Sequence, residues 1–243
     1  MTRSRWLLFA ALIACGRSSP PSKTDGSYQG RTIAPACSHL GADWLERPDR
    51  EAREQPDRVL ALLQVSRGMT VADVGAGTGY FTVRLAHRVG ASGKVLATDV
   101  QPEMLRKIDA RLGREQITNV QLIRGTERSA ELPARCCDLV LLVDVYHELA
   151  DPPSVMAGIR RALKDTGKLA LVEYRAEDPT VPIRPEQREA SPEGDKMSLS
   201  QIRQELEPLG FAFVTSIEEL PDQRIVVFTR DDVIPTTPAG QRR

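Results

Sequence analysis

The sequence has no excess of either charge and contains few aromatic residues or cysteines. Its 243 residues include 33 lysines and arginines against 33 aspartates and glutamates, so the formal net charge is zero. Nucleic-acid-binding proteins usually carry a basic excess, so the charge balance argues against a nucleic-acid partner. Aromatic residues make up 5% of the chain, and no cluster of them marks an aromatic-lined cage. Four cysteines are too few for a disulfide-based scaffold.

A hydrophobic run long enough to cross a membrane is missing from the N-terminus. The apolar stretch Leu7–Cys15 has nine residues, whereas a membrane-spanning helix needs about 20. Two arginines precede it, as in the first part of a bacterial export signal. Its last four residues, Leu-Ile-Ala-Cys, resemble the lipobox of bacterial lipoproteins, in which cleavage precedes a cysteine that carries the lipid. We therefore expect a signal peptide at 1–14 and a lipidated Cys15.

These features predict the location of the protein and divide the chain into segments. The lipid would hold the protein to a membrane on the periplasmic side of the cell envelope, with no other membrane contact; without such a signal, the expected location is the cytoplasm. Residues 15–40 hold serine, proline and glycine with little apolar periodicity, which predicts a flexible tether. Residues 41–230 are expected to form one domain, and 231–243 a disordered tail.

Short apolar runs alternate with amphipathic segments throughout the expected domain. Strands are predicted at 70–74, 94–100, 120–124, 138–143, 167–174, 211–217 and 224–229. Helices are predicted at 49–65, 80–89, 102–115, 152–164 and 198–209. This alternation indicates an α/β fold with a doubly wound, mostly parallel sheet, helices on both faces and an antiparallel pair at the end.

A glycine-rich turn follows the first predicted strand, in the sequence Asp73-Val-Gly-Ala-Gly-Thr-Gly79. Glycines allow a tight turn and close approach of a ligand to the backbone. The spacing is G-x-G-x-G, whereas dinucleotide-binding loops read G-x-G-x-x-G. Asp73 beside the loop suits the cationic end of a ligand. Asp99, at the end of the next strand, can accept hydrogen bonds from both hydroxyls of a ribose.

These motifs resemble those of the class I S-adenosylmethionine-dependent methyltransferases, over about residues 45–230. The resemblance implies a Rossmann-like seven-stranded sheet in the order 3-2-1-4-5-7-6, with the seventh strand antiparallel. It implies S-adenosylmethionine as the cofactor, with Asp99 at its ribose and Gly75 and Gly77 beneath its methionine part. The full set of expected cofactor-binding residues is Asp73, Gly75, Ala76, Gly77, Gly79, Asp99, Val100, Thr126, Glu127 and Asp144.

Candidate groups for the chemistry follow the fourth and fifth predicted strands. Asp144, Tyr146 and His147 place a carboxylate, a phenol and an imidazole at the mouth of the expected site. His147 could act as a general base near neutral pH, while Asp144 or Tyr146 orients the acceptor. The alternative is that His147 merely begins the next helix. Glu173 and Tyr174 are expected to line the acceptor pocket, and no metal site is predicted.

The function expected from these features is transfer of a methyl group from S-adenosylmethionine to a small-molecule acceptor. The alternative is a non-catalytic cofactor-binding or scaffold lipoprotein that kept the fold, because the cofactor is made in the cytosol while the signal directs export. A nicotinamide-dependent oxidoreductase is disfavoured by the spacing of the glycine loop.

Overall fold

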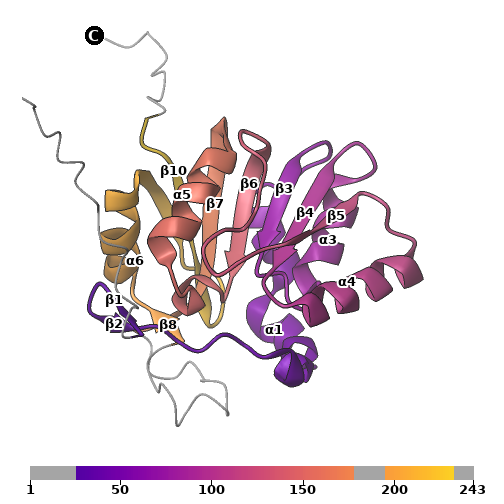
Figure 1. Cartoon of the computed structure of the whole chain (residues 1–243), viewed down its shortest axis with the longest axis horizontal. Helices are drawn as coiled ribbons and strands as arrows, with labels where there is room; N and C mark the ends of the chain where they lie inside the picture. The colour runs from indigo at the N-terminus through magenta and orange to yellow at the C-terminus, as the bar shows by residue number, and fades with distance from the viewer. Residues whose placement is uncertain (1–25, 178–194, 233–243) are drawn as a thin grey trace, which may run out of the picture.

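The computed structural model describes residues 26–177 and 195–232. The predicted signal peptide, Cys15 and nearly all of the predicted tail therefore lie outside the described residues. Most of the described chain belongs to one large sheet and the helices that cover it (Figure 1).

The large sheet has the strand order β5-β4-β3-β6-β7-β10-β9. The first five strands in this order run parallel, and β10 is antiparallel to both of its neighbours. An eighth, two-residue strand, β8, pairs with β7. The doubly wound fold and the seven-strand order are thus confirmed, with β8 as an addition. The strands are β3 (Thr70–Val74), β4 (Lys94–Asp99), β5 (Val120–Arg124), β6 (Cys137–Val143), β7 (Leu163–Arg175), β8 (Lys196–Met197), β9 (Phe211–Ile217) and β10 (Gln223–Arg230).

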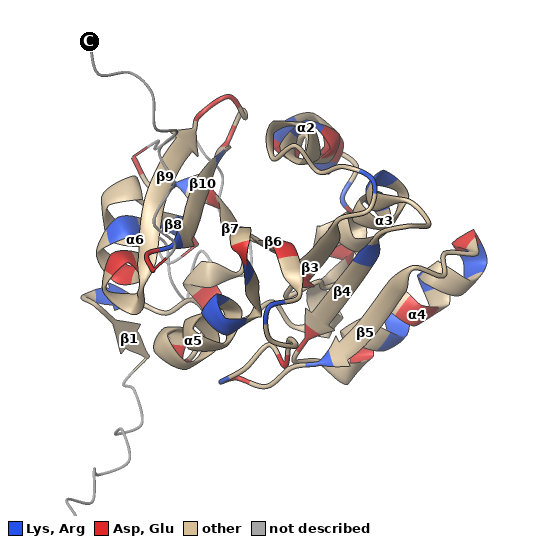
Figure 2. Ribbon diagram, turned by 90° about the horizontal axis from the view of Figure 1, so that it is seen from above, with Lys and Arg blue, Asp and Glu red and all other residues tan. Residues whose placement is uncertain are grey.

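Helices cover both faces of this sheet. The α-helices are α1 (Arg50–Glu54), α2 (Pro56–Leu62), α3 (Tyr80–Val89), α4 (Pro102–Glu115), α5 (Pro152–Ala162) and α6 (Leu199–Leu206). The 3-10 helices are η1 (His39–Glu46), η2 (Tyr146–Glu148) and η4 (Glu207–Leu209). None of the helices in the described ranges is long and apolar enough to cross a membrane. Basic and acidic residues both occur on α2, α4 and α6 (Figure 2), in keeping with the neutral composition.

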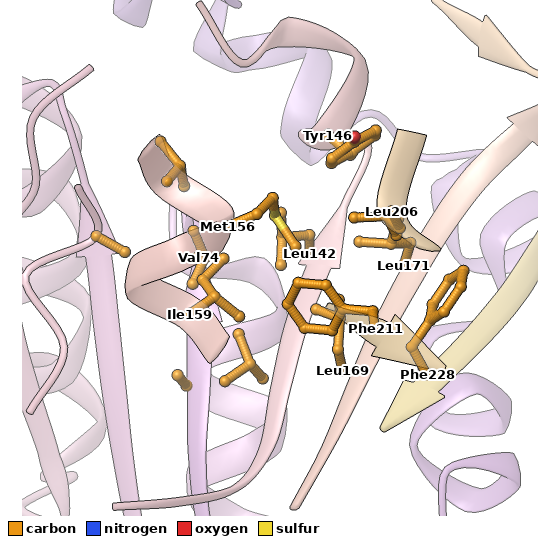
Figure 3. Packing of buried hydrophobic residues seen from close by; sticks show 14 of the residues in the cluster. Val74, Leu142, Tyr146, Met156, Ile159, Leu169, Leu171, Leu206, Phe211 and Phe228 are labelled. Atoms are coloured by element: carbon orange, nitrogen blue, oxygen red, sulfur yellow. The ribbon is translucent and has the colours of Figure 1, made fainter. Parts of the chain in front are cut away.

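The central strand β6 contributes side chains to the hydrophobic cores on both faces of the sheet, against which the two layers of helices pack. Its side chains alternate between the faces of the sheet, so Leu139 and Leu141 pack with α2 and α3, while Val140 and Leu142 pack with α5 and α6. All four side chains are almost completely buried. Figure 3 shows the second of these clusters, in which residues of α5 and α6 pack on side chains of the sheet, among them Phe211 of β9. The nearly continuous apolar sequence of β6 is that of a parallel strand buried on both faces.

One predicted helix is two helices in the structure. The segment 49–65 divides into α1 and α2 at Gln55, which adopts a left-handed conformation with φ of 46°. Pro56 follows directly, and a proline disfavours the α conformation of the residue before it. The break redirects the chain, so that α1 reaches the sheet edge described below.

Residues 26–38, here called the N-terminal segment, pack against the domain. The segment contains the hairpin of β1 (Ser27–Tyr28) and β2 (Arg31–Thr32). The Arg31 guanidinium donates to both carboxylate oxygens of buried Glu205, at 2.7 and 3.2 Å, and Ala34 is 1% exposed. The tether predicted for 15–40 is therefore wrong for residues 26–40, because its composition does not reveal these polar contacts. In Figure 1 the segment runs along one end of the sheet, in indigo.

Removal of the Arg31 guanidinium tests how much the docking of the N-terminal segment contributes to the free energy of unfolding. Arg31→Met leaves the Glu205 carboxylate buried without its cation, so we expect the free energy of unfolding to fall by about 3 kcal/mol, measured by urea denaturation. The matched control is Arg58→Met, which breaks a pair whose side chains are 50% and 56% exposed and should cost less than about 1 kcal/mol. Equal losses in the two variants would contradict the docking described here.

Candidate active site

Two cavities meet at the edge of the sheet where the parallel strands end. The larger, of about 520 Å³, lies between the ends of β4 and β5 and the N-terminal segment. The narrower, of about 80 Å³, lies between the glycine loop, α1 and the end of β6. Gly75, Val145 and Glu148 line both. Ligands of open α/β sheets bind at this edge, so the cavities form the candidate site.

The glycine loop needs its glycines for two reasons. Gly75 and Gly77 have φ of 70° and 56°, values that residues with a side chain rarely adopt. A β-carbon at Gly75 would lie 2.6 Å from a methyl carbon of Val145, and one at Gly77 would lie 2.9 Å from a methyl carbon of Leu45. The absent side chains therefore let the backbone lie against the two cavities.

Asp99 connects the loop with the end of β4. Its Oδ2 accepts a hydrogen bond from the Gly77 N–H at 2.9 Å, and its Oδ1 accepts one from the Gln101 N–H at 2.8 Å. Burial raises the pKa of Asp99, and these backbone donors act in the opposite direction. Each oxygen keeps a further lone pair, and the residue lines the larger cavity. Asp99 can therefore accept hydrogen bonds from a diol without losing its structural role.

The other predicted cofactor residues divide between the cavities. Val100, Thr126 and Glu127 line the larger cavity. Asp73 and Ala76 line the narrow one, as do Gly77 and Asp144. Gly79 lines neither: its φ is 82°, and a β-carbon there would lie 3.2 Å from Ile108 of α4. Its position corrects the expectation of ligand contact, since it allows α3 and α4 to approach each other.

Asp73 lies in β3, just before the glycine loop, and its side chain is 3% exposed. Its Oδ2 accepts a hydrogen bond from the Thr82 hydroxyl at 2.6 Å. Burial raises the pKa of Asp73 to about 6, against the opposing effect of this hydrogen bond. A cation in the narrow cavity would favour its ionised form, which agrees with the cationic ligand end expected from the sequence.

An ion-pair cluster from α1 and its flanking turn forms another wall of the narrow cavity. Glu54, which is 1% exposed, pairs with the guanidinium groups of Arg47 and Arg50, the latter at 2.6 Å. Tyr174 of β7 accepts a hydrogen bond from Arg47 at 3.0 Å and donates one to Glu54 at 3.2 Å. Tyr174 therefore lies at the narrow cavity, and its hydroxyl is engaged by this cluster.

Asp144 directly follows β6 and lines the narrow cavity. Its φ is 53°, a left-handed conformation that aspartate tolerates better than most residues with a side chain. The side-chain amide of Gln223 donates to both carboxylate oxygens, at 3.0 and 2.9 Å. Burial, followed by the charges of Glu54 and Glu173, raises the pKa of Asp144 to about 8.

His147 lies in η2 and is held by Glu173. Its Nδ1 lies 2.6 Å from Glu173 Oε2, and both side chains are almost completely buried. Its Nε2 is buried without a hydrogen-bond partner in the described part of the chain. Burial alone would lower the pKa of His147, but the charge and hydrogen bond of Glu173 outweigh it and raise the pKa to about 9. The imidazole that lines the cavity is therefore cationic at neutral pH.

The structure corrects the expectations for Tyr146 and Glu173. Tyr146 is 0% exposed and lines neither cavity; it packs in the core cluster with Met156 and Leu206 (Figure 3). The short turn of η2 directs it away from the cavity that His147 faces. Glu173 also lines neither cavity, because it bridges β7 and η2: its second oxygen accepts from the Tyr146 N–H at 3.0 Å. It positions His147 and does not contact the space for an acceptor.

Several residues of the site were not anticipated from the sequence. The Gln101 side chain donates to the Cys37 carbonyl at 2.7 Å and accepts from the His39 N–H at 2.8 Å, which fastens the N-terminal segment across both cavities. Its position just after Asp99 was the one available signal. No signal in the sequence pointed to Gln223, because its partner Asp144 is 79 residues away.

Within the described ranges, no cluster of three or more metal-binding side chains occurs.

The larger cavity fits the cofactor that the resemblance implies. Ligand cavities measure about 300–1,000 Å³, and this one combines an acid able to accept from a diol with the open backbone of a glycine loop. The narrow cavity continues it past Gly75. The acids around that space suit a cationic sulfur.

Comparisons with known proteins agree with this arrangement. Residues 65–220 match the family described as "Methyltransferase domain". The ubiquinone/menaquinone biosynthesis C-methyltransferase UbiE of Escherichia coli is 28% identical over 116 residues, which are 45% of this chain and 44% of that protein. The chain thus spans less than half the length of this curated relative.

Solved structures show the same fold. A SAM-dependent methyltransferase from Aquifex aeolicus is 26% identical with a TM-score of 0.71, over 79% of this chain and 98% of the other. The YcgJ protein of Bacillus subtilis is 21% identical with a TM-score of 0.56, over 68% of this chain and 71% of the other. At that identity, the second similarity supports the fold alone.

The protonation of His147 can be tested directly by NMR, because the chain has three histidines. We expect the His147 ring to stay protonated until the pH approaches about 9. In Glu173→Gln the opposing charge is lost, so burial should bring the His147 pKa below its usual value. The control is Glu115→Gln, which removes the acid 3.8 Å from exposed His87 and should leave His147 unchanged. A His147 titration near its ordinary value in the unaltered protein would refute the ion pair.

Proposed function

Since this chain belongs to the methyltransferase-domain family, we propose that it transfers a methyl group from S-adenosylmethionine to a small-molecule acceptor at the candidate site. It is a class I S-adenosylmethionine-dependent methyltransferase by its family, fold and relatives. The observation that carries the assignment to this site is the meeting of two cavities at the glycine loop, with Asp99 in the larger and Asp144 in the narrower.

The chain's contribution to the reaction is to bind and orient. When bound, S-adenosylmethionine supplies an electrophilic methyl group on a positively charged sulfur. Asp99 would hold the ribose hydroxyls, and the adenine would lie in the part of the larger cavity lined by Val100, Thr126 and Glu127. Gly75 and Gly77 allow the methionine part to lie against the backbone, with Asp73 beneath them. Alignment of donor and acceptor contributes to the rate enhancement in such a displacement.

A small acceptor is supported by the enclosure and charge of the site. Trp44 and Arg47 line the narrow cavity, and the Arg47 guanidinium lies 4.3 Å from the centre of the Trp44 ring. A polymeric substrate needs an open groove, and a nucleic acid would also be favoured by a basic surface. The net charge of zero and the narrow cavity favour neither.

The Asp99 carboxylate provides the test of the cofactor assignment. Asp99→Ala should weaken binding of S-adenosylmethionine by about 1.5–3 kcal/mol, or roughly 10- to 150-fold in Kd, measured by calorimetry. The control Asp109→Ala alters an exposed acid of α4 and should leave Kd unchanged. Thermal unfolding of both variants separates lost binding from lost folding. The proposal is wrong if the unaltered protein binds neither S-adenosylmethionine nor S-adenosylhomocysteine, or if Asp99→Ala binds as tightly as it does.

We also propose that the enzyme is anchored by lipid at Cys15 on the periplasmic side of a bacterial membrane. The arginines before the apolar stretch and the lipobox-like sequence at 12–15 support this location. Multiple acyl chains on one cysteine would hold the protein stably, whereas a single chain gives marginal binding.

Metabolic labelling tests the anchor. With radioactive palmitate, we expect the unaltered protein to be labelled and to sediment with membranes, because the lipid is attached through the Cys15 thiol. Cys15→Ser should lose both label and sedimentation, while the control Cys37→Ser keeps both. An unlabelled, freely soluble protein in the unaltered strain would rule out lipidation.

A further inference from the structure

We infer that Asp144 is the proton acceptor of the site, and that the positive charge of the cofactor converts its carboxyl group to the carboxylate on binding. Binding of S-adenosylmethionine therefore releases a proton that binding of S-adenosylhomocysteine does not. This inference rests on the proposed function and identifies the group that prepares the site for transfer.

The geometry places Asp144 where an acceptor would lie. It lines the narrow cavity beside Gly75 and Val145, at the junction with the larger cavity. Its left-handed conformation and its backbone hydrogen bond to the Val172 carbonyl, at 2.9 Å, fix the direction of the side chain. The Gln223 amide, which is wholly buried, holds both carboxylate oxygens from β10.

Asp144 differs from Glu54 and Glu173 in its partners. Glu54 is paired with two guanidinium groups and Glu173 with the His147 imidazole. In the described part of the chain, by contrast, the hydrogen bonds to the Asp144 carboxylate come from the neutral amide of Gln223. The groups that act on its charge or bind it are Arg47, Arg50 and Glu54 from the α1 side, His147 from η2, Glu173 and Tyr174 from β7, and Gln223 from β10. Three further acids line the same cavity: Asp73, Glu148 and Asp195.

The balance of these charges determines the state of Asp144. Burial, Glu54 and Glu173 favour the protonated form, and His147 and Arg50 only partly oppose them. The pKa of about 8 means that most molecules carry the proton on Asp144 at pH 7. A cation entering the same enclosed space favours the carboxylate. S-adenosylmethionine and S-adenosylhomocysteine differ by one methyl group and by this positive charge, so only the first should displace the proton.

The released proton leaves Asp144 ready for the reaction. During transfer, the lone pair of the acceptor atom forms the bond to the methyl carbon, and the electrons of the broken carbon–sulfur bond remain on sulfur. The proton of the acceptor passes to the Asp144 carboxylate. The carboxyl group is thereby restored, which matches the neutral charge of the thioether product that remains in the site.

Calorimetry in two buffers of different ionisation enthalpy, phosphate and Tris, measures the protons exchanged on binding. At pH 7 we expect S-adenosylmethionine to release close to one proton more than S-adenosylhomocysteine does. Asp144→Asn, which keeps the shape and removes the titration, should abolish this difference. The matched control Asp109→Asn changes an exposed acid of α4 and should preserve it.

The outcomes distinguish this inference from the proposed function. Binding of both ligands with equal proton counts overturns the inference and leaves the cofactor assignment standing. Binding of neither ligand refutes the proposed function itself. If the difference survives in Asp144→Asn and vanishes in His147→Gln, the imidazolium is the source of the proton and the inference is wrong.

Gln223 acts as a positioning residue for Asp144 and has a separate test. Its N–H groups stabilise the carboxylate, so Gln223→Leu should raise the pH at which the extra proton is released, observed by repeating the calorimetry from pH 6 to 9. A purely structural role would weaken both ligands equally and leave the proton difference unchanged. That result would remove Gln223 from the mechanism.

Discussion

The parallel pairing of β4, β3, β6 and β7 forces the chain to leave four neighbouring strands at the same edge of the sheet. This edge is where helix N-termini and turns leave backbone groups unpaired, so ligands can replace the missing partners. The larger and the narrow cavity both follow from it. The crossover connections, which make the strands parallel and place helices on both faces, are therefore what brings the site residues together.

The same edge gathers carboxylates in a place with little water, where ionised groups need compensation. Each acid has a different partner. Asp99 accepts from two backbone N–H groups, Asp73 from a hydroxyl, Glu173 from an imidazole and Glu54 from two guanidinium groups. Asp144 accepts from a neutral amide. Asp73 and Asp99 also have neutral donors, but the pKa of Asp144 is raised to about 8 and that of Asp73 only to about 6. Asp144 is therefore the acid of the narrow cavity that a positively charged ligand would convert to the carboxylate near pH 7.

The sequence predicted the regular parts of the fold well. The bounds of β3, β5, β9, α3 and α4 agree with the structure because apolar periodicity follows directly from which face is buried. The glycine loop and Asp99 were predictable for a similar reason, since both are fixed by their distance from strand ends.

What was missed depends on contacts between distant residues. In η2, sequence order cannot tell which side chain enters the cavity, so Tyr146 was misplaced while His147 was not. The roles of Glu173 and Gln223 depend on the pairing of β7 with β10, which places both near the end of β6. The composition of residues 26–40 resembles a linker, yet single polar contacts dock it to the domain.

This docking changes the geometry expected of a lipid-anchored enzyme. With Cys15 as the proposed anchor, ten residues, 16–25, separate the lipid from the first described residue, Gly26. A fully extended chain spans at most about 3.6 Å per residue, so the start of the hairpin lies within roughly 40 Å of the membrane surface. The segment then continues across both cavities. The proposed anchor and the segment that lines both cavities would thus belong to one short stretch of chain, which would keep the active site close to the membrane surface.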